Sequence, residues 1–600
     1  MRIGVMLFLV GALLGCQSKV DQNTVNLGEN LAVYNPDDLD KLLEDKKLTE
    51  DQRKTSIEAL RTAFKASYVG YDLKKTLIGK SGDEIFDECL KDTTTAPMST
   101  VEFYDEVRKC LARIQDTHIA VSKIITSAKI ITGIAGGMWV GDQLIISGTR
   151  PKLLAKFEEL AGVPEGTYTK AFKVGVQVEE IDGRPALEAA QELEPYISGS
   201  SRLAVRADVS EYLFTRTFHY PKNAKIDLKL RLEDGSTFQA TLPWVIWSGT
   251  GSLEPKSELV RRGLSESSKL GANTLPKREG FEDGSELFKT LINRHEYHSS
   301  QTTDSGSIVV TGYAELNKQM HCYLQISGFS LSEGTEPPRY PIYEPTGDKF
   351  LKAGFIDVIK THLQTCEAFK ANVILDLRSN GGGTSRLAAE MFSLFENTSG
   401  PLIYQGRSHS TRPGALPVIF DYLSELDPKK TKVEAEMYLK VFQEAQATQS
   451  QTTAWVLERQ AKFETGIFNG KVLVLTGPQC VSACDNSVRR FKATGRGTIV
   501  GEATNGTGFG FISDGEEGGA YFRDPFNLYL VSIPNSAFQS HVLPTNTVFI
   551  EDEVQKGLIV PFDQIPLLEN HPTIPDVEIK LTRKDLLGYE DYLQALVPLL

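Results

Sequence analysis

Ser482 stands where a buried strand is expected to run into a helix, a position in which a hydroxyl can act as a nucleophile. The apolar run Lys471–Thr476 predicts the strand, and the pattern after it predicts a helix from Ser482 to Thr494. A serine at such a junction lies at the positive end of the helix dipole, where an alkoxide or an oxyanion is stabilised. The alternative is a serine that only caps the helix, which is a common use of this residue type.

A run of three glycines, Gly381–Gly383, follows a second predicted strand, Asn372–Leu377. Glycine reaches positive φ and leaves its backbone N–H groups accessible, and such groups can form an oxyanion hole. Taken alone, a glycine run is usually only a turn. Strands and helices alternate from residue 306 onward, which indicates an α/β architecture. Because catalytic groups gather at strand ends in such sheets, we expect the serine and glycine loops to meet.

These two segments, followed by the loop Gly501–Gly506, resemble the catalytic core of the tricorn and C-terminal-processing-protease clan of serine peptidases. The resemblance covers about residues 306–600 and implies a crotonase-like α/β protease core. It implies that Ser482 is the nucleophile. The backbone N–H groups of Ala483 and of Gly381 or Gly382 would then hold the oxyanion. This acyl-transfer chemistry implies no cofactor and no metal.

The general base follows from comparing the two branches of the clan. The processing-protease branch carries a lysine where this chain has Thr507, and a threonine cannot act as a general base at neutral pH. The tricorn-like branch uses a histidine that follows an upstream helix, and the segment Asp116-Thr117-His118 resembles that part. An imidazole, with an unperturbed pKa of about 6.5, can accept the serine proton and return it to the leaving amine. Thr117 matches a serine with an auxiliary role in that branch.

A third residue should orient the imidazole. In the tricorn-like branch it is a glutamate shortly before a Pro-Asp pair, and Glu569 precedes Pro575-Asp576 here. The segment between Ser482 and Glu569 is longer than the branch leads us to expect. Glu551 and Glu553 therefore remain rivals, and an ordinary surface glutamate remains the plain alternative.

The elements around these residues predict a multi-domain α/β protein. Helical spacing of apolar residues precedes His118, and β-type runs follow it; within them, Val174–Pro185 loosely resembles the strand and turn of a PDZ module. The expected parts are a leader 1–15, a tether 16–35, an N-terminal helical domain 36–118, a PDZ-like β-rich domain 119–249, a linker 250–305, and the protease core 306–600 with a helical insertion at about 410–465.

The leader resembles a bacterial lipoprotein signal. A basic start and an apolar stretch end in Leu13-Leu14-Gly15-Cys16, which implies cleavage before Cys16 and lipidation of its sulfur. Gln17, which is not an aspartate, favours the outer membrane, facing the periplasm or the exterior. The alternative is an ordinary secreted protein with a chance cysteine.

The net charge, the spacing of the histidines and the cysteine content limit which partners and metal sites the sequence allows. A net charge of −13 argues against nucleic acid, which would require a basic face. His295 and His298 lack the spacing of a zinc protease, so a solvated loop is the preferred interpretation. Six cysteines remain besides Cys16. Their proximity suggests the pairs 89–110, 322–366 and 480–484, although other pairings and free thiols stay open.

The sequence thus predicts a serine endopeptidase with a Ser-His-Glu triad that acts on proteins or peptides in the bacterial envelope. Its expected partners are that substrate and, through the lipid anchor, a membrane; a homodimer stays open. The alternative is a non-catalytic protein on the same fold that binds a peptide or a hydrophobic ligand. Such a binder has no need of Ser482, His118 and Glu569 together.

Overall fold

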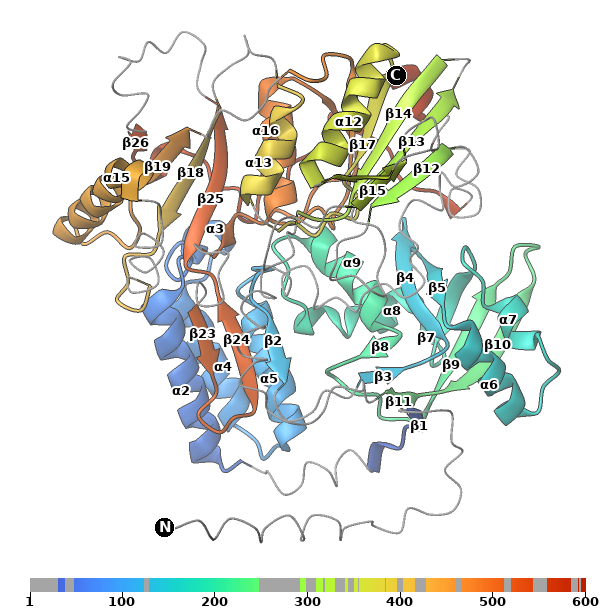
Figure 1. Ribbon diagram of the computed structural model, residues 1–600. Helices are drawn as coiled ribbons and strands as arrows, with labels where there is room; N and C mark the ends of the chain where they lie inside the picture. Colours follow the sequence, from blue (N-terminus) through green and yellow to red (C-terminus); the bar gives the residue numbers. More distant parts are fainter. Residues whose placement is uncertain are drawn as a thin grey trace, which may run out of the picture.

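A seven-stranded sheet in the order β12-β13-β14-β17-β20-β21-β27 forms the centre of the C-terminal half (Figure 1). The strands from β14 to β27 are parallel, and β12 and β13 are antiparallel additions at one edge. Parallel strands covered on both faces are apolar throughout, and β20 is buried at every position. The bounds are β12 (Ile292–Tyr297), β13 (Val309–Leu316), β14 (Gln319–Ile326), β17 (Asn372–Asp376), β20 (Val472–Thr476), β21 (Thr498–Gly501) and β27 (Val577–Glu578).

Helices α12 (Phe355–Ala368), α13 (Ser385–Ser393) and α16 (Ala483–Thr494) cover one face of this sheet, while Tyr592 and Leu596 pack on the other. Strand β17 is followed by the glycine run and α13, and β20 is followed by Ser482 and α16, in the order that the sequence predicted. The fold is a mixed α/β fold.

The computed structural model describes residues 31–37, 48–123, 129–247, 292–297 and most of 309–600. In the last range the exceptions are residues 317–318, 330–339, 344–349, 354, 384, 397–402, 416–427, 460–465, 512–519, 543–557, 584–591 and 593–594. The predicted leader, Cys16, most of the linker, Glu551 and Glu553 lie outside the described residues. None of the helices in the described ranges has the length and apolar character needed to cross a bilayer.

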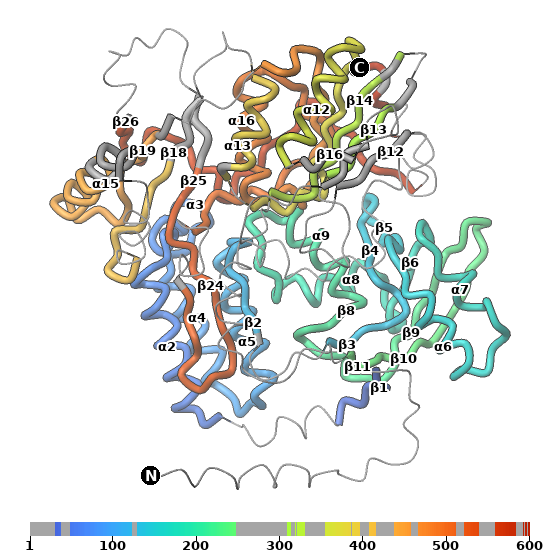
Figure 2. The backbone as a smooth tube through the Cα atoms, in the orientation of Figure 1, coloured from blue at the N-terminus to red at the C-terminus, as the bar shows by residue number. Residues whose placement is uncertain are grey.

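The N-terminal helices α2 (Glu50–Ser67), α4 (Gly82–Thr94) and α5 (Thr100–Ala112) each begin with a capping box, in which a Ser or Thr and a Glu or Gln three residues later satisfy the first backbone N–H groups. They pack beside a small sheet of β2 (Val121–Lys123), β24 (Tyr529–Ile533) and β23 (Ala520–Arg523), as both views show (Figures 1 and 2). Segments four hundred residues apart thus share one core.

The β-rich unit begins later than expected. Strand β2 lies within the predicted range 119–249 but pairs with β24 of the C-terminal half, because its partner comes from a distant segment that local patterning does not reveal. The unit's main sheet has the order β10-β9-β6-β5-β4, from β4 (Ile134–Val140), β5 (Gln143–Thr149), β6 (Gln177–Ile181), β9 (Lys225–Arg231) and β10 (Thr237–Pro243). Helix α9 (Arg202–Tyr212) packs on β4, whose Gly137 carbonyl accepts from Ser210 at 2.8 Å.

Two other boundaries differ from the expectation. The predicted tether ends in strand β1 (Leu31–Val33), which pairs with β11 (Val245–Trp247). The predicted linker contains β12, a polar edge strand that pairs with β13, so residues 292–297 belong to the central sheet. Both segments are too short or too polar to show a strand pattern on their own.

The insertion at about 410–465 is only partly helical. It contains α15 (Pro428–Ala447) and also strand β19 (Trp455–Arg459). Strand β19 joins a five-stranded antiparallel sheet in the order β22-β25-β18-β19-β26. The other strands are β22 (Phe509–Gly510), β25 (Ser536–Val542), β18 (Ile403–His409) and β26 (Leu558–Val560).

All three cysteine pairs suggested by proximity are confirmed as disulfides: Cys89–Cys110, Cys322–Cys366 and Cys480–Cys484. The first joins α4 to α5, the second joins β14 to α12, and the third encloses Ser482.

Candidate active site

Ser482 sits between β20 and α16 in a backbone conformation that is unusual for a residue with a side chain, with φ 58° and ψ −118°. It occupies the N-cap position of α16, yet its hydroxyl makes no capping hydrogen bond. The capping alternative is therefore not what the structure shows. Strained backbone of this kind is concentrated at functional sites, where the surrounding structure holds it in place.

The glycine loop touches the serine loop directly. A Cβ added to Gly382, which has φ 86°, would lie 2.5 Å from the Val481 carbonyl oxygen and 2.8 Å from the Ser482 Cβ. Asn380 fixes the approach, because its carbonyl accepts from the Val481 N–H at 3.1 Å and its side chain accepts from the Gly382 N–H at 2.9 Å. The N–H of Gly381 donates to Ser327 at 3.2 Å.

His118 is buried beyond the end of α5, with 6% of its surface exposed. Its N–H donates to Asp116 at 2.9 Å, its carbonyl accepts from Ser532 at 2.7 Å, and its ring makes an edge contact with Phe511. Burial lowers the pKa of His118 to about 4. The negative charge of Glu569 and a backbone hydrogen bond to Phe509 raise this pKa, but they do not outweigh burial. The ring is therefore neutral at pH 7. Within the described part of the chain, its buried Nδ1 has no hydrogen-bond partner, and no hydrogen bond joins the ring to Ser482.

The segments of His118 and Ser482 nevertheless belong to one hydrogen-bonded cluster. The Thr117 hydroxyl donates to the Asn505 side-chain oxygen at 2.6 Å, and the Asn505 N–H donates to the Cys480 carbonyl at 3.1 Å. Asn505 thus lies between the residue before His118 and the disulfide loop that carries Ser482. The sequence analysis did not single out Asn505, although it lies in the Gly501–Gly506 loop quoted there.

Glu569 is fully buried and its carboxylate accepts four hydrogen bonds. Oε1 accepts from Lys74 Nζ at 2.8 Å and from Ser200 Oγ at 3.2 Å. Oε2 accepts from the N–H groups of Gly508 at 2.8 Å and Phe509 at 3.1 Å. Glu569 is therefore not the plain surface glutamate that sequence alone left open.

Lys74 and Ser200 were missed by sequence reasoning. Each lies in a segment without a motif, Lys74 at the start of the short helix α3 (Lys74–Ile78) and Ser200 in a loop before α9. Ser200 also donates to, or accepts from, the Thr117 hydroxyl at 3.1 Å. Only the tertiary structure brings them to the carboxylate.

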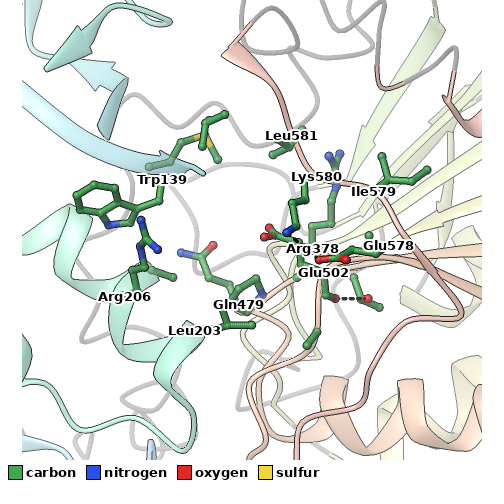
Figure 3. A pocket seen from close by; sticks show the side chains of 18 of the residues that line it. Trp139, Leu203, Arg206, Arg378, Gln479, Glu502, Glu578, Ile579, Lys580 and Leu581 are labelled. Carbon is green, nitrogen blue, oxygen red and sulfur yellow. Dashed lines mark hydrogen bonds and ion pairs between the residues drawn. The ribbon is translucent and has the colours of Figure 1, made fainter. Parts of the chain in front are cut away.

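A cavity of about 670 Å³ opens next to these loops, between the β-rich unit and the central sheet (Figure 3). Trp139, Leu203 and Arg206 lie on one side of it, and Arg378, Glu502 and Lys580 lie on the other, with Gln479 between them. The cavity therefore adjoins the loop that carries Ser482, three residues after Gln479.

One cluster among the described residues has metal-ligand geometry, formed by Cys322, His362 and Cys366. Its two sulfurs are joined in a disulfide, so they are not thiolate ligands.

Comparisons with known proteins agree with this geometry at the level of the fold. Residues 321–512 match the model of peptidase family S41. The order of its parts resembles that of the chlamydial protease-like activity factor, CPAF, and two solved structures of mature CPAF are similar to the chain. The one complexed with lactacystin has a TM-score of 0.62 at 14% identity, covering 92% of this chain and 98% of that chain.

The other mature CPAF structure has a TM-score of 0.61 at 14% identity, covering 91% of this chain and 96% of that chain. At this identity the likeness carries the fold and not the residue roles. Among curated protein sequences, none matches this chain.

Proposed function

Because residues 321–512 belong to peptidase family S41 and the chain is a serine-type peptidase, we propose that it is an endopeptidase with Ser482, His118 and Glu569 as its catalytic triad. Its substrates are proteins or peptides of the bacterial envelope. The observation that carries the proposal is the state of Ser482, a serine held at positive φ at the start of α16 with its hydroxyl unused as a cap.

In the proposed reaction the Ser482 oxygen attacks the peptide carbonyl carbon while its proton passes to His118. Collapse of the tetrahedral intermediate expels the amine, which takes that proton, and water then hydrolyses the acyl-enzyme by the same route. Glu569 stabilises the imidazolium that forms in each half. Support for this pairing comes from the shared neighbours of the two residues: the Phe509 N–H donates to Glu569 at 3.1 Å, and the His118 ring lies 3.9 Å from a Cβ placed on the next residue, Gly510.

The proposed oxyanion site combines the N–H of Ala483, the first residue of α16, with that of Gly381 or Gly382. Both glycine N–H groups have intramolecular acceptors, so we propose that substrate binding turns one of them toward the developing oxyanion. The contact between Gly382 and Ser482 supports this assignment. Thr117 serves in an auxiliary role by holding Asn505.

We further propose that the β-rich unit is PDZ-like and that the core is crotonase-like. Strand β4 lies at the edge of its sheet, and its residues Gly137–Val140 line the cavity shown in Figure 3 together with Gly141 and Asp142, which follow the strand. An extended substrate chain could enter there and reach the Ser482 loop past Gln479. The lipid anchor at Cys16 and the location at the outer membrane belong to the same proposal.

Labelling with a fluorophosphonate tests the nucleophile, because this reagent modifies an activated serine. We expect the wild-type protein to be labelled and to cleave a protein substrate, and Ser482→Ala to lose both properties while keeping its thermal unfolding temperature. Ser487→Ala is the matched control, since Ser487 lies on the same helix and donates to the Ala483 carbonyl. Cleavage that survives in Ser482→Ala would exclude this site. A wild-type protein that is neither labelled nor active would favour the alternative, a non-catalytic protein that binds a peptide or a hydrophobic ligand.

A further inference from the structure

Three parts of the chain meet on the carboxylate of Glu569. Lys74 comes from the N-terminal helical part, Ser200 from the β-rich unit, and the N–H groups of Gly508 and Phe509 from the C-terminal half. The carboxylate and the ammonium are both buried, with exposed fractions of 0% and 1%. Removing one partner of such a pair leaves an uncompensated buried charge.

All three N–H donors of the Lys74 ammonium have acceptors. They are the Glu569 carboxylate at 2.8 Å, the Gln115 carbonyl at 2.8 Å and the Asn570 side-chain oxygen at 2.7 Å. The ammonium also lies 5.4 Å from the centre of the Phe509 ring. Lys74 is therefore fixed in position. It connects the segment of Glu569 to the segment of His118, since Gln115 lies three positions before His118.

A second buried carboxylate, Asp116, lies near Lys74. Burial raises the pKa of Asp116, and the charge of Lys74 opposes this rise. Asp116 accepts from the His118 N–H at 2.9 Å and from the Tyr68 hydroxyl at 2.8 Å. With both carboxylates ionised, Asp116, Glu569 and Lys74 carry a net charge of −1 beside a neutral imidazole. Transfer of the serine proton to His118 brings this buried group to zero.

We propose that Lys74 is a positioning residue of the peptidase site: it keeps Glu569 ionised and holds its carboxylate in one orientation, so that the group favours the imidazolium of His118. This inference rests on the proposed function and adds a residue to it. Lys74 itself touches neither Ser482 nor a substrate, and it acts through Glu569.

Removal of the lysine changes the charge of its neighbours in a definite direction. Burial already raises the pKa of Glu569, and the Asp116 charge raises it further, whereas Lys74 lowers it. Without the ammonium, one of the two carboxylates takes up a proton as the pH falls. A protonated Glu569 is neutral and no longer stabilises a cation. The titratable groups around it are Lys74 from α3, Asp116 and His118 beyond α5, and Tyr68 beyond α2.

The test compares Lys74→Met with Lys75→Met through kcat/KM measured from pH 5 to 9. Lys75 is the next residue of the same helix, but it is exposed and pairs with Glu84. For Lys74→Met we expect at least a tenfold loss of kcat/KM at pH 7, with the acid limb of the profile moved to higher pH and part of the activity regained above pH 8. Lys75→Met should follow the wild-type profile.

A double-mutant cycle separates positioning from general stabilisation. If Lys74 acts through Glu569, adding Lys74→Met to Glu569→Gln should reduce kcat/KM by less than threefold. Two results together would overturn the proposal and leave Lys74 a structural residue. The loss of kcat/KM in Lys74→Met would be the same at every pH, and the loss in the double variant would equal the product of the two single-variant losses. If Lys74→Met does not fold, Lys74→Gln is tested for the same shift of the acid limb.

The pH dependence of fluorophosphonate labelling gives a second readout on the same variants. A wild-type protein that is labelled, with no shift of the labelling profile in Lys74→Met, refutes the role of Lys74 alone. A wild-type protein that is never labelled refutes the proposed function, and the role of Lys74 with it.

Discussion

The Thr117 hydroxyl donates a hydrogen bond of 2.6 Å to the side chain of Asn505, although the two residues are 388 positions apart in the chain. The Asn505 N–H in turn donates to Cys480, so a single residue spans the distance between the histidine segment and the serine loop. The relative placement of His118 and Ser482 therefore depends on contacts that neither residue makes itself.

Replacing Thr117 by valine tests this connection, because valine keeps the shape of threonine but cannot donate to Asn505. The Asn505 side-chain oxygen then keeps its bond from Thr507, but the Ser200 N–H, which donates to the Thr117 hydroxyl at 2.9 Å, loses this acceptor. A buried polar group left without its partner costs about 1–3 kcal/mol, so we expect kcat/KM to fall roughly tenfold to a hundredfold. Thr117→Ser retains a hydroxyl and should keep most of the activity. Equal kinetics for the valine and serine variants would show that the contact has no part in catalysis.

Gly382→Ala tests the contact between the glycine loop and Ser482, the proposed nucleophile. The new methyl group would overlap the Val481 carbonyl and the Ser482 Cβ, so one of the two loops must move. Since a displacement of about 1 Å can reduce a rate about a hundredfold, we expect a loss of this order in kcat. Gly162→Ala is the control: Gly162 also has positive φ, at 64°, but nothing lies within 4 Å of its added Cβ. Comparable activity losses in both variants would attribute the effect to backbone strain alone.

Cys484→Ser opens the ring that encloses Ser482. The short disulfide loop contributes about 2 kcal/mol to the free energy of unfolding in the chain-entropy description. We expect a lower midpoint of denaturation together with a lower kcat. Cys110→Ser, which opens the disulfide between α4 and α5, should reduce stability while preserving kcat. If Cys484→Ser were as active and as stable as the wild type, the disulfide would have no part in holding the proposed nucleophile, Ser482, in place.

The pH dependence should reflect the burial of His118, whose pKa is about 4 in the folded protein. A histidine with a lowered folded-state pKa contributes stability that is present above its unfolded pKa of about 6.5 and is lost as the pH falls through 4. Between pH 7 and pH 4 the wild type should therefore lose more stability than His118→Gln. Thermal unfolding at the two pH values measures the difference, and parallel curves for the two proteins would contradict it.

Asp485 should change the stability of the protein with pH in the opposite direction from His118. Burial raises the pKa of this carboxyl to about 7, against hydrogen bonds from Thr504, Thr507 and Gly506. The stability that it contributes is fully present below the unfolded pKa of about 3.9 and is lost as the pH rises through 7. Asp485→Asn should therefore show a smaller fall in melting temperature between pH 5 and pH 8 than the wild type. An unchanged slope would place the Asp485 pKa in its ordinary range.

The parts of the fold that the sequence predicted are those with a strong local signal. The apolar runs that became β17 and β20, the helix that begins after Ser482 and the helical character of the segment before His118 were visible as patterns of apolar and polar residues. The division of that segment into separate capped helices was not predicted. The cysteine pairs were suggested by proximity along the chain, and that suggestion is confirmed.

What the sequence did not reveal depends on distant partners. A β-type run was expected after His118, but its pairing with β24 was not, because β2 has only three residues and its partner lies far along the chain. Lys74 is one of many lysines in a helical region, and nothing nearby indicates that it is buried against Glu569. Asn505 lies in a loop that the family resemblance had marked, yet its bond to Thr117 exists only after the two halves of the chain have docked.

Under the proposed triad, the convergence of three segments on Glu569 also sets the point in folding at which the protein becomes active. During synthesis the segment with His118 emerges first, the serine loop much later and the acid close to the end, and the carboxylate has its full set of donors only once the helical part, the β-rich unit and the core are assembled. On the proposed mechanism, a partly synthesised or partly folded chain lacks the complete site and is inactive. Assembly of all three parts would then be required before the chain can cleave a substrate.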